Sequence, residues 1–459
     1  MKTARGKGGA GAKVARRVSP SRRAAFEVLR RVEEESAFAS VLLAHATNDL
    51  RSDDRALCYE LTLGVLRWQL WLDALIGYYA ARDAATLDAP VRRALRLGLY
   101  QLRFLSRVPA SAAVNESVNL AHEYKLRSAA GFINAVLRRA TREPDFDPAS
   151  TARDELERIS ISTSHPTWLV ARWAAEFGAL DAEQIARANN RTPPVAFRVN
   201  TMRAAEREVV ERLRASGVEV VASQVAPGAW RVASGTGGEA LHALASEGLI
   251  YTQDEASQLV GHVTGARAGE RVLDVCAAPG SKATQIAALT GGRALVVACD
   301  VYEHRLRTVV ESAARQGVAN ILTVALDAET STLPFSDGSF DRVLVDAPCT
   351  GTGTLRHNPE IRWRITPLDV SELAARQQVI LANAARAVRG GGRLVYSTCS
   401  LEREENESVV ASFLAGHSEF RQIQADSPAE LLTRTGAART FPQRDDTDGF
   451  FVAVLEQGR

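Results

Sequence analysis

The chain has 459 residues, of which 46% are hydrophobic and 24% are charged, a composition typical of globular proteins. At roughly 150 residues per domain, this length predicts two to four domains. No stretch approaches about 18 uninterrupted apolar residues, which excludes a membrane-spanning helix. No apolar segment follows the basic N-terminus, so we expect no secretory signal. Five cysteines are too few for a disulfide scaffold and favour a reducing compartment, the cytoplasm.

The formal net charge of +2 conceals an uneven distribution along the chain. Residues 1–150 contain 24 Lys and Arg against 16 Asp and Glu, whereas residues 151–459 contain 32 against 38. Residues 1–18 contain six basic side chains and no acidic one. Rich in Gly and Ala, this segment cannot bury apolar surface and predicts a disordered basic tail. Two interpretations of the tail stay open, a nonspecific contact with phosphates and a solvated chain end without a partner.

Helical periodicity dominates from residue 19 to about residue 142. Apolar residues recur three and four positions apart without strand-like alternation, so residues 19–143 predict an independent all-α bundle. The clearest helical segments are residues 24–44, 55–80, 91–105, 111–125 and 131–140. Two prolines and three acidic residues follow in residues 142–150, and this composition predicts a linker over residues 144–160.

A small α+β module is predicted for residues 161–250. One helix is expected to begin at His165-Pro166 and to end at Gly178, because proline favours a first helical turn and glycine a helix end. The pattern then changes to a strand, an amphipathic helix and a second strand. These three elements cover residues 195–201, 206–217 and 218–223.

From about residue 269 onward, buried apolar strands alternate with helices. The predicted strands are residues 271–275, 294–300, 321–327, 342–349 and 393–400. This alternation is typical of a doubly wound parallel sheet and predicts an α/β domain over residues 251–459. A long helix is expected from about Leu368, and residues 449–456 predict an antiparallel strand near the edge of the sheet.

Ligands of doubly wound sheets bind at the carboxyl ends of the strands. The first strand leads into the loop Cys276–Lys282, whose small residues allow backbone N–H groups to approach a ligand at a helix start. Asp300 ends the second strand twenty residues after Gly280, an arrangement typical of an acid that binds ribose hydroxyls. Asp327 ends the third strand.

Asp346 ends the fourth strand and is followed by Cys349, while Cys399 lies at the end of the fifth. Taken singly, the loop is equally well a tight turn, each acid a helix cap and each cysteine an inert thiol. Their occurrence at successive strand ends favours a cofactor and reaction site. We expect no metal, since C-x-x-C spacing and paired histidines are lacking, and no serine hydrolase, since G-x-S-x-G is lacking. A reactive thiolate at Cys399, with the cation Lys282 as a candidate neighbour, fits better.

Several segments resemble a known family. VLDVCAAPGSK, VDAPCTGTG followed by LRHNPEIRW, and YSTCSLEREENE closely resemble motifs of the RNA cytosine-5 methyltransferases that use S-adenosyl-L-methionine. TQDEASQL and TDGFF resemble further motifs of that family. The helical bundle, with its late NAVLRR, resembles the RNA-binding domain of the antitermination factor NusB. The combination resembles the bacterial 16S ribosomal RNA cytosine-5 methyltransferases.

The resemblance implies a Rossmann-like methyltransferase domain over residues 251–459 and RNA binding by the bundle and the small module. Asp300 is then expected to bind the ribose, Asp327 the adenine side, and Asp346 the cofactor or the target base. Cys399 is the implied nucleophile, and Cys349 helps to release the product. The implied cofactor loop consists of Cys276, Ala277, Ala278, Pro279, Gly280, Ser281 and Lys282.

The implied reaction methylates carbon 5 of a specific cytosine in 16S rRNA, naked or in an early assembly intermediate, by a monomer. The Cys399 thiolate attacks carbon 6 of the base, and a protonated Asp346 stabilises the charge that develops at ring N3. The base has to be unstacked to reach the thiolate. His357, in the loop after Cys349, is a candidate RNA contact. The alternatives are a cytosine of tRNA or of another rRNA, and a non-catalytic RNA-binding antitermination or assembly factor.

Overall fold

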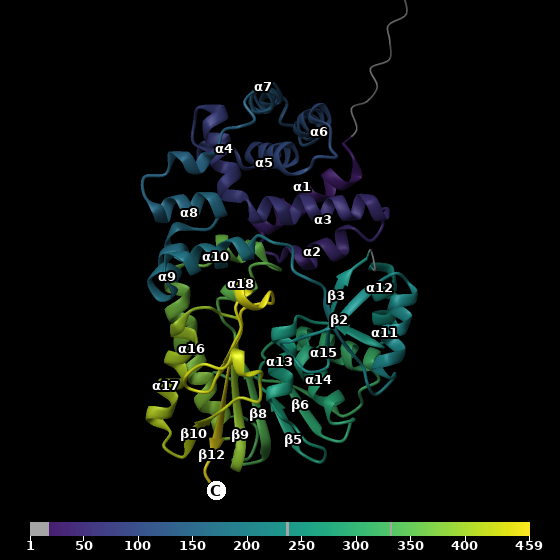
Figure 1. Cartoon of the computed structure of the whole chain (residues 1–459), viewed down its shortest axis with the longest axis vertical. Coiled ribbons are helices and arrows are strands. Elements are labelled where there is room, and N and C mark those ends of the chain that lie inside the picture. Colours follow the sequence, from purple (N-terminus) through teal and green to yellow (C-terminus); the bar gives the residue numbers. More distant parts are fainter. Residues whose placement is uncertain (1–17, 236–237, 331–332) are drawn as a thin grey trace, which may run out of the picture. The chain divides into compact units, whose positions relative to one another are not determined.

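The computed structural model describes residues 18–235, 238–330 and 333–459 (Figure 1). Contacts between Cα atoms divide the chain into two compact units, Met1–Ala171 and Arg172–Arg459. The tail predicted for residues 1–18 lies outside the described residues except for Val18, which is buried. No helix in the described part of the chain is long and apolar enough to cross a membrane.

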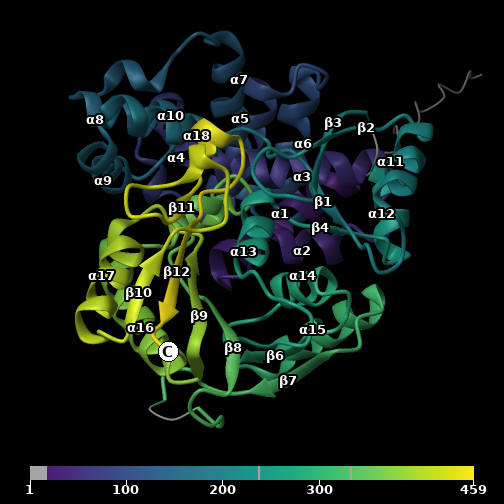
Figure 2. The same cartoon turned by 60° about the horizontal axis from the view of Figure 1, so that its bottom comes forward.

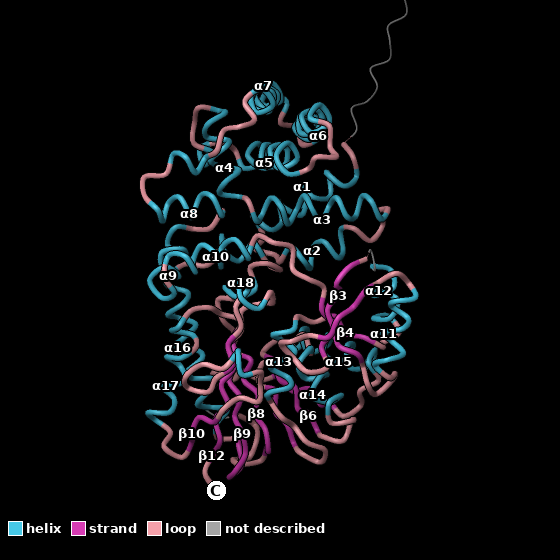
Figure 3. The backbone as a smooth tube through the Cα atoms, viewed as in Figure 1, coloured by secondary structure: helices cyan, strands magenta, loops and turns pink. Residues whose placement is uncertain are grey.

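The regular elements described in the N-terminal unit are all helical (Figure 3). The α-helices are α1 (Pro20–Glu34), α2 (Ala39–Ala46), α3 (Ser52–Arg67), α4 (Gln69–Ala80), α5 (Ala89–Phe104), α6 (Ala110–Glu123), α7 (Ala130–Arg142) and α8 (Glu155–Thr163). The predicted all-α bundle is therefore confirmed. Two predicted segments, residues 24–44 and 55–80, each contain two helices, and the second breaks at Trp68, whose backbone (φ −105°, ψ 19°) leaves the helical region.

The segment 144–160 differs from the predicted linker because it packs on the bundle as short helices. Residues Pro148–Thr151 form a 3-10 helix, and Asp154 caps α8 by accepting a hydrogen bond from the Glu157 N–H at 2.8 Å. Phe146 stacks on Tyr78 with 3.6 Å between the ring centroids. Proline at a first helical turn and aspartate at a cap stabilise helix starts, so the composition that indicated a linker instead serves these two helices.

The small α+β module contains a four-stranded antiparallel sheet in the order β2-β3-β1-β4. Its strands are β1 (Ala196–Val199), β2 (Glu219–Ala222), β3 (Ala229–Ser234) and β4 (Ile250–Thr252), and its helices α11 (Glu206–Ala215) and α12 (Gly238–Ser246). The predicted strand, helix and strand are present as β1, α11 and β2. The sheet continues two residues past the predicted boundary at residue 250.

Two further helices precede this sheet. Helix α9 (Thr167–Phe177) follows Pro166 and ends before Gly178, as predicted. Helix α10 (Ala179–Asn189) follows at once and was not predicted. Gly178 has a φ of 89°, a conformation that costs glycine little, so the chain turns there and begins a second helix.

The large sheet has the order β10-β12-β9-β8-β5-β6-β7, and β11 (Ala438–Arg439) pairs with β12. Strands β5 (Arg271–Asp274), β6 (Leu295–Asp300), β7 (Ile321–Ala325), β8 (Phe340–Asp346) and β9 (Val388–Thr398) are parallel. Strands β10 (Phe420–Ile423) and β12 (Phe451–Gln457) are antiparallel additions. Figure 2 shows the row from β10 to β7. The predicted parallel sheet and late antiparallel strand are confirmed, although β10 rather than β12 forms the edge.

Helices cover both faces of this sheet. One face packs against α13 (Glu255–Val263), α14 (Ser281–Leu289) and α15 (Glu303–Gln316), and the other against α16 (Pro367–Ala385) and α17 (Glu407–Gly416). Successive residues of β5 point to opposite faces, with Val272 in one core and Leu273 in the other, as the two-residue period of a strand requires. The strand order reverses between β5 and β8, and sheets of this kind bind ligands at that point.

Candidate active site

A pocket of about 340 Å³ lies at the carboxyl ends of the parallel strands. Seven residues predicted for the site line it: Cys276, Ala278, Asp300, Asp327, Asp346, Cys349 and Cys399. Ala277, Pro279, Gly280, Ser281 and Lys282 belong to the same loop but are not among the lining residues. The structure therefore brings the strand-end acids and both cysteines together around one cavity, which has the volume of a small-molecule site.

The loop Cys276–Lys282 makes a tight connection from β5 to α14. The Ala277 N–H donates a hydrogen bond to the Cys299 carbonyl at 2.7 Å and thereby ties the loop to β6. Gly280 has a φ of 99°, and a Cβ there would lie 3.1 Å from Val309. Because glycine allows both the left-handed backbone and this close approach, the loop packs tightly against α15 just before α14 begins.

Asp300 and Asp327 differ in their surroundings. Asp300 is 5% exposed. Its carboxylate accepts the Tyr302 N–H at 3.1 Å and forms an ion pair of 3.1 Å with Arg305. Asp327 is exposed, and its Oδ1 accepts the Glu329 N–H at 2.9 Å. Both carboxylates therefore have fixed directions within the pocket lining.

Lys282 and Asp346 form the most enclosed ion pair of the site. The Lys282 ammonium donates to Asp346 Oδ2 at 2.6 Å and lies 5.3 Å from the centre of the Phe450 ring. The Ser397 hydroxyl donates to Asp346 Oδ1 at 2.7 Å. Burial alone would lower the pKa of Lys282, but the negative charge of Asp346 and its hydrogen bond outweigh this, and the pKa is raised. Lys282 therefore carries its proton at neutral pH.

The thiols of Cys349 and Cys399 are in direct contact, with 3.3 Å between their Sγ atoms. The hydrogen bond with Cys399, followed by burial, raises the pKa of Cys349 well above its usual value. Either sulfur can donate in this contact, and the raised pKa favours the thiol form of Cys349 at neutral pH. Burial also raises the pKa of Cys276 and Cys299, and it raises that of Cys58 to about 11.

Two buried acidic residues near the pocket were not among the site residues predicted from the sequence. Asp274, the last residue of β5, is fully buried, and burial together with the Asp346 charge raises its pKa to about 7. Glu405 is also fully buried and accepts hydrogen bonds from Thr350 and Ser400, which follow the two cysteines. For Asp274 the sequence contained a usable signal, namely an acidic residue within the apolar run VLDV. Glu405 offered no comparable signal, because three glutamates occur within residues 402–405.

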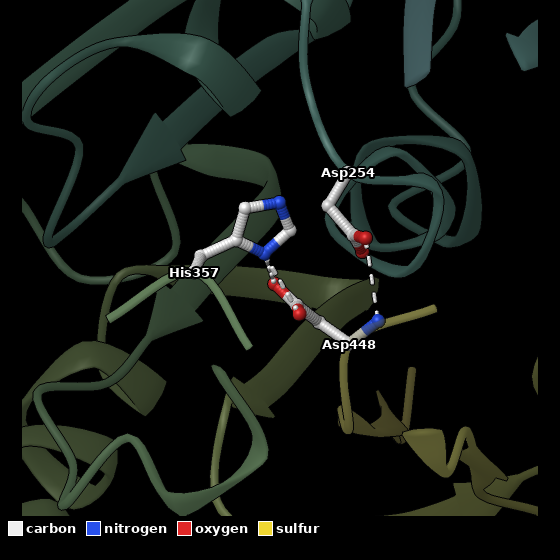
Figure 4. Close-up of side chains that lie close together, drawn as sticks. All are labelled: Asp254, His357 and Asp448. Carbon is white, nitrogen blue, oxygen red and sulfur yellow. Dashed lines mark hydrogen bonds and ion pairs between the residues drawn. The ribbon is translucent and has the colours of Figure 1, made fainter. Parts of the chain in front are cut away.

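Asp254, His357 and Asp448 form a separate cluster of side chains (Figure 4). His357 Nδ1 lies 3.0 Å from Asp448 Oδ1, and the Asp448 N–H donates to Asp254 Oδ2 at 3.2 Å. Asp254 also caps α13 by accepting the Ala256 N–H at 2.8 Å, and it accepts the Thr447 hydroxyl. Both Asp254 oxygens thus serve the chain's own donors, which is the arrangement of a structural cap. No described contact connects His357 with the pocket lining.

Comparisons with known proteins cover nearly the whole chain. A family model described as 16S rRNA methyltransferase RsmB/F matches residues 263–456, and a NusB family model matches residues 19–142. A model described as an RsmF/B-like, ferredoxin-like domain matches residues 165–237, the region of the small α+β module. All three parts of the chain therefore match models that have been described for methyltransferases or for NusB proteins.

Two curated relatives and two solved structures are similar over long ranges. A "probable ribosomal RNA small subunit methyltransferase B" of Bacillus subtilis (strain 168) is 34% identical over 442 residues, which are 94% of this chain and 98% of the relative. Ribosomal RNA small subunit methyltransferase B of Pseudomonas syringae pv. tomato is 35% identical, over 88% of this chain and 89% of the relative.

The crystal structure of PH0851 superposes with a TM-score of 0.83 at 29% identity, over 96% of this chain and 99% of that one. NSun6 from Pyrococcus horikoshii with SFG has a TM-score of 0.57 at 21% identity, over 64% and 98%, and shares the fold. Because these curated relatives are more than 30% identical over almost their full length, the chain belongs to the RsmB/F family of methyltransferases and carries the NusB domain.

Proposed function

We propose that the chain transfers the methyl group of S-adenosyl-L-methionine to carbon 5 of a cytosine in 16S rRNA through a covalent bond between Cys399 and carbon 6. The observation that carries this proposal is the contact of 3.3 Å between Cys349 and Cys399 at the wall of a pocket. Carbon 5 of cytosine is a poor nucleophile, and a thiolate attacking carbon 6 activates it. A second thiol beside the first serves the later release of the product.

The pocket lining suits the proposed cofactor. Asp300 ends β6 inside the pocket with a carboxylate that can accept ribose hydroxyls. Asp327 and Ile380 also line the pocket, where they would contact the adenine of the cofactor. The cavity of about 340 Å³ is within the range of small-molecule sites. S-adenosyl-L-methionine, when bound, supplies an electrophilic methyl group. The loop Cys276–Lys282, of which Cys276 and Ala278 line the pocket, would hold the cofactor from the side of β5.

The chain's own residues carry out the proton and bond changes on the base. The Cys399 sulfur bonds to carbon 6, and the electron pair of the ring double bond moves toward carbon 5. Negative charge develops at ring N3, and a proton held by the Lys282–Asp346 pair, 2.6 Å apart, neutralises it. Carbon 5 takes the methyl group, and the proton on N3 returns to the Lys282–Asp346 pair. Carbon 5 then loses its own proton to Cys349. The bond to Cys399 then breaks, and its electron pair returns to that sulfur.

Cys349 suits the step in which the carbon 5 proton leaves. While the Cys399 thiolate is present, its hydrogen bond keeps the proton on Cys349. Once Cys399 is bonded to carbon 6, that acceptor is lost and the pKa of Cys349 falls. Cys349 then gives its proton to solvent, and its thiolate takes the carbon 5 proton. Cys349 therefore becomes available as a base only after the bond between Cys399 and carbon 6 has formed, so bond formation precedes removal of the carbon 5 proton.

RNA is the proposed substrate because the similar relatives are named for the small ribosomal subunit. The NusB domain and the ferredoxin-like module are proposed to bind this RNA, and the surplus of basic residues in residues 1–150 favours such a contact. The substrate form proposed is naked 16S rRNA or an early assembly intermediate, because the target base has to leave its stack to enter the pocket. The enzyme is proposed to act as a monomer in the cytoplasm.

One experiment tests the reaction and its substrate together. Purified chain is incubated with S-adenosyl-L-methionine carrying a labelled methyl group and, in parallel, with free 16S rRNA, assembled 30S subunits, 23S rRNA and bulk tRNA. We expect label only in free 16S rRNA, at a single cytosine that bisulfite sequencing locates. Label in tRNA or 23S rRNA assigns a different substrate, and RNA binding without any transfer of label contradicts the enzymatic function.

A further inference from the structure

Glu405 lies between two loops that carry the thiols, residues 347–354 after β8 and residues 399–402 after β9, here called the two cysteine loops. Its Oε1 accepts the Thr350 N–H at 2.9 Å, and its Oε2 accepts the Thr350 hydroxyl at 2.5 Å. The Ser400 hydroxyl also donates to Oε2. Thr350 follows Cys349 directly and Ser400 follows Cys399 directly. One carboxylate therefore binds the residues adjacent to both thiols.

The carboxylate is held in place by a buried polar network. Gln377 on α16 donates to Glu405 Oε1 at 3.0 Å and to the Pro348 carbonyl at 2.9 Å. The Tyr396 hydroxyl lies 3.0 Å from Gln377 Oε1 and 2.5 Å from the Glu405 carbonyl. Gln377, Tyr396 and Glu405 are all fully buried. The network thus connects the first cysteine loop, β9 and α16 through Glu405, and polar networks with every member satisfied make a structure rigid.

The Glu405 carboxylate has no basic partner within salt-bridge distance in the described part of the chain, and four donors from Thr350, Ser400 and Gln377 surround it. Burial raises the pKa of Glu405, and the hydrogen bonds from Ser400 and Thr350 oppose that rise. Its negative charge also contributes to the raised pKa of Cys349. Burying a carboxylate without a counter-ion costs free energy. Because Glu405 is nevertheless buried in this way beside two thiols, we infer a role beyond packing.

On the basis of the proposed function, we propose that Glu405 is the positioning residue that holds the two cysteine loops so that the Cys349 and Cys399 sulfurs stay in hydrogen-bonding contact. Its charge additionally keeps the proton of the pair on Cys349, so that Cys399 remains the attacking sulfur. A neutral isostere preserves most of the hydrogen bonds but not the charge, because a Gln side chain retains one acceptor oxygen and the two hydroxyl donors can rotate.

The test compares Glu405→Gln and Glu405→Ala with the matched control Glu404→Gln. Glu404 is the adjacent glutamate, has a side chain that is 49% exposed and forms an ion pair with Arg172 at 2.8 Å. The first readout is alkylation of each cysteine by iodoacetamide across a pH series, located by mass spectrometry in the full chain. This readout needs no methyl transfer, so it can support Glu405 positioning even if the proposed reaction is wrong.

We expect the pH at which Cys349 becomes half-reactive to move downward in Glu405→Gln, because a negative charge that opposed its ionisation is gone. Methyl transfer by Glu405→Gln should show a kcat lowered by about tenfold with an unchanged KM for RNA. Glu405→Ala, which removes every acceptor, should lower kcat by roughly a hundredfold. Thermal unfolding shows whether this second variant remains folded, and Glu405→Gln decides the result if it does not.

An alkylation profile of Cys349 in Glu405→Gln that coincides with those of the wild type and Glu404→Gln overturns the proposal. Equal kcat values for Glu405→Gln and Glu404→Gln overturn it as well. If the wild type transfers no methyl group to any RNA while the Cys349 profile still shifts in Glu405→Gln, the positioning by Glu405 stands and the proposed function is wrong.

Discussion

The Sγ atoms of Cys349 and Cys399 lie 3.3 Å apart, although the two residues are 50 positions apart in the chain. They meet because β8 and β9 are parallel neighbours, with Asp346 opposite Ser397 in the register. Cys349 lies three positions after the last residue of β8 and Cys399 directly follows β9, so both lie at the carboxyl edge of the sheet. The hydrogen bond with Cys399, followed by burial, raises the pKa of Cys349 well above its usual value.

The proposed roles of the two thiols predict opposite outcomes for the two cysteine variants. Cys399→Ser should abolish methyl transfer while binding of S-adenosyl-L-methionine survives, because the serine hydroxyl is a much weaker nucleophile than a thiolate. Cys349→Ala should instead accumulate a covalent complex between protein and RNA, visible as a band of retarded mobility on a denaturing gel. Normal turnover by Cys399→Ser contradicts the mechanism. A retarded band in the double variant would show that another residue forms the bond.

Lys282→Met should lower kcat by about a hundredfold, since it removes the proton donor of the pair with Asp346. It should also lower the thermal midpoint of the C-terminal unit, because loss of one partner leaves a largely enclosed carboxylate uncompensated. The matched control is Lys125→Met, on an exposed residue of the N-terminal unit. Steady-state methyl transfer and thermal unfolding measure both effects. Equal kcat values for the two variants contradict a role of Lys282 in proton transfer.

Gly353→Ala should disrupt the first cysteine loop. A Cβ at this position would lie 2.0 Å from the Gly449 carbonyl oxygen and 2.9 Å from the Cys399 carbonyl oxygen, so the backbone next to Cys399 has to move. We expect kcat to fall by about a hundredfold. Gly77→Ala in α4 is the control, since its Cβ meets nothing within 4 Å, and it should gain up to about 1 kcal/mol of stability. Undiminished kcat in Gly353→Ala would contradict this placement of the loop.

Asp300→Ala should weaken the binding of S-adenosyl-L-methionine. The lost hydrogen bonds to a charged acceptor correspond to an increase of the dissociation constant by about 10- to 100-fold. Isothermal titration calorimetry measures the constant, and Asp337→Ala, whose side chain is 70% exposed, is the control. Equal affinities of the two variants would remove Asp300 from the proposed cofactor site.

The cluster of Asp254, His357 and Asp448 predicts a dependence of stability on pH. Burial and the Asp448 charge raise the pKa of Asp254 to about 7 from 3.8. The folded state therefore holds a proton that the unfolded state has lost between these values, and stability declines as pH rises from about 4 to about 7. His357 has the same sign, because its pKa is also raised, against burial, by the charge of Asp448.

Asp254→Asn should flatten this decline, since asparagine caps α13 equally well and does not titrate. Thermal midpoints at pH 4.5, 5.5, 6.5 and 7.5 provide the measurement, and Asp426→Asn, on a side chain that is 85% exposed, is the control. Asp274 has the same raised pKa, so a part of the decline should remain. A decline identical in wild type and Asp254→Asn would show that Asp254 is ionised in the folded protein.

The amino-acid sequence determined the classes of structure and their order. Apolar residues three and four apart form the helical bundle, and alternating or continuous apolar runs form the strands, because these patterns are local and follow from the helix and strand periods. The positions of the acids and cysteines at the ends of the strands could be predicted for the same reason, because a strand ends where its apolar run ends. Asp300, Asp346, Cys349 and Cys399 all line the pocket as the strand-end argument required.

Tertiary structure alone decided which side chains form pairs. Strand order and register determine three of these contacts. They are the ion pair of Lys282 with Asp346, the contact of Cys349 with Cys399, and the hydrogen bonds that Glu405 accepts from both cysteine loops. The helices formed by residues 148–163 depend likewise on packing, because proline and aspartate stabilise helix starts and turns with equal ease. Local patterns specify which elements a chain forms, whereas the buried polar contacts between distant segments exist only once those elements have packed.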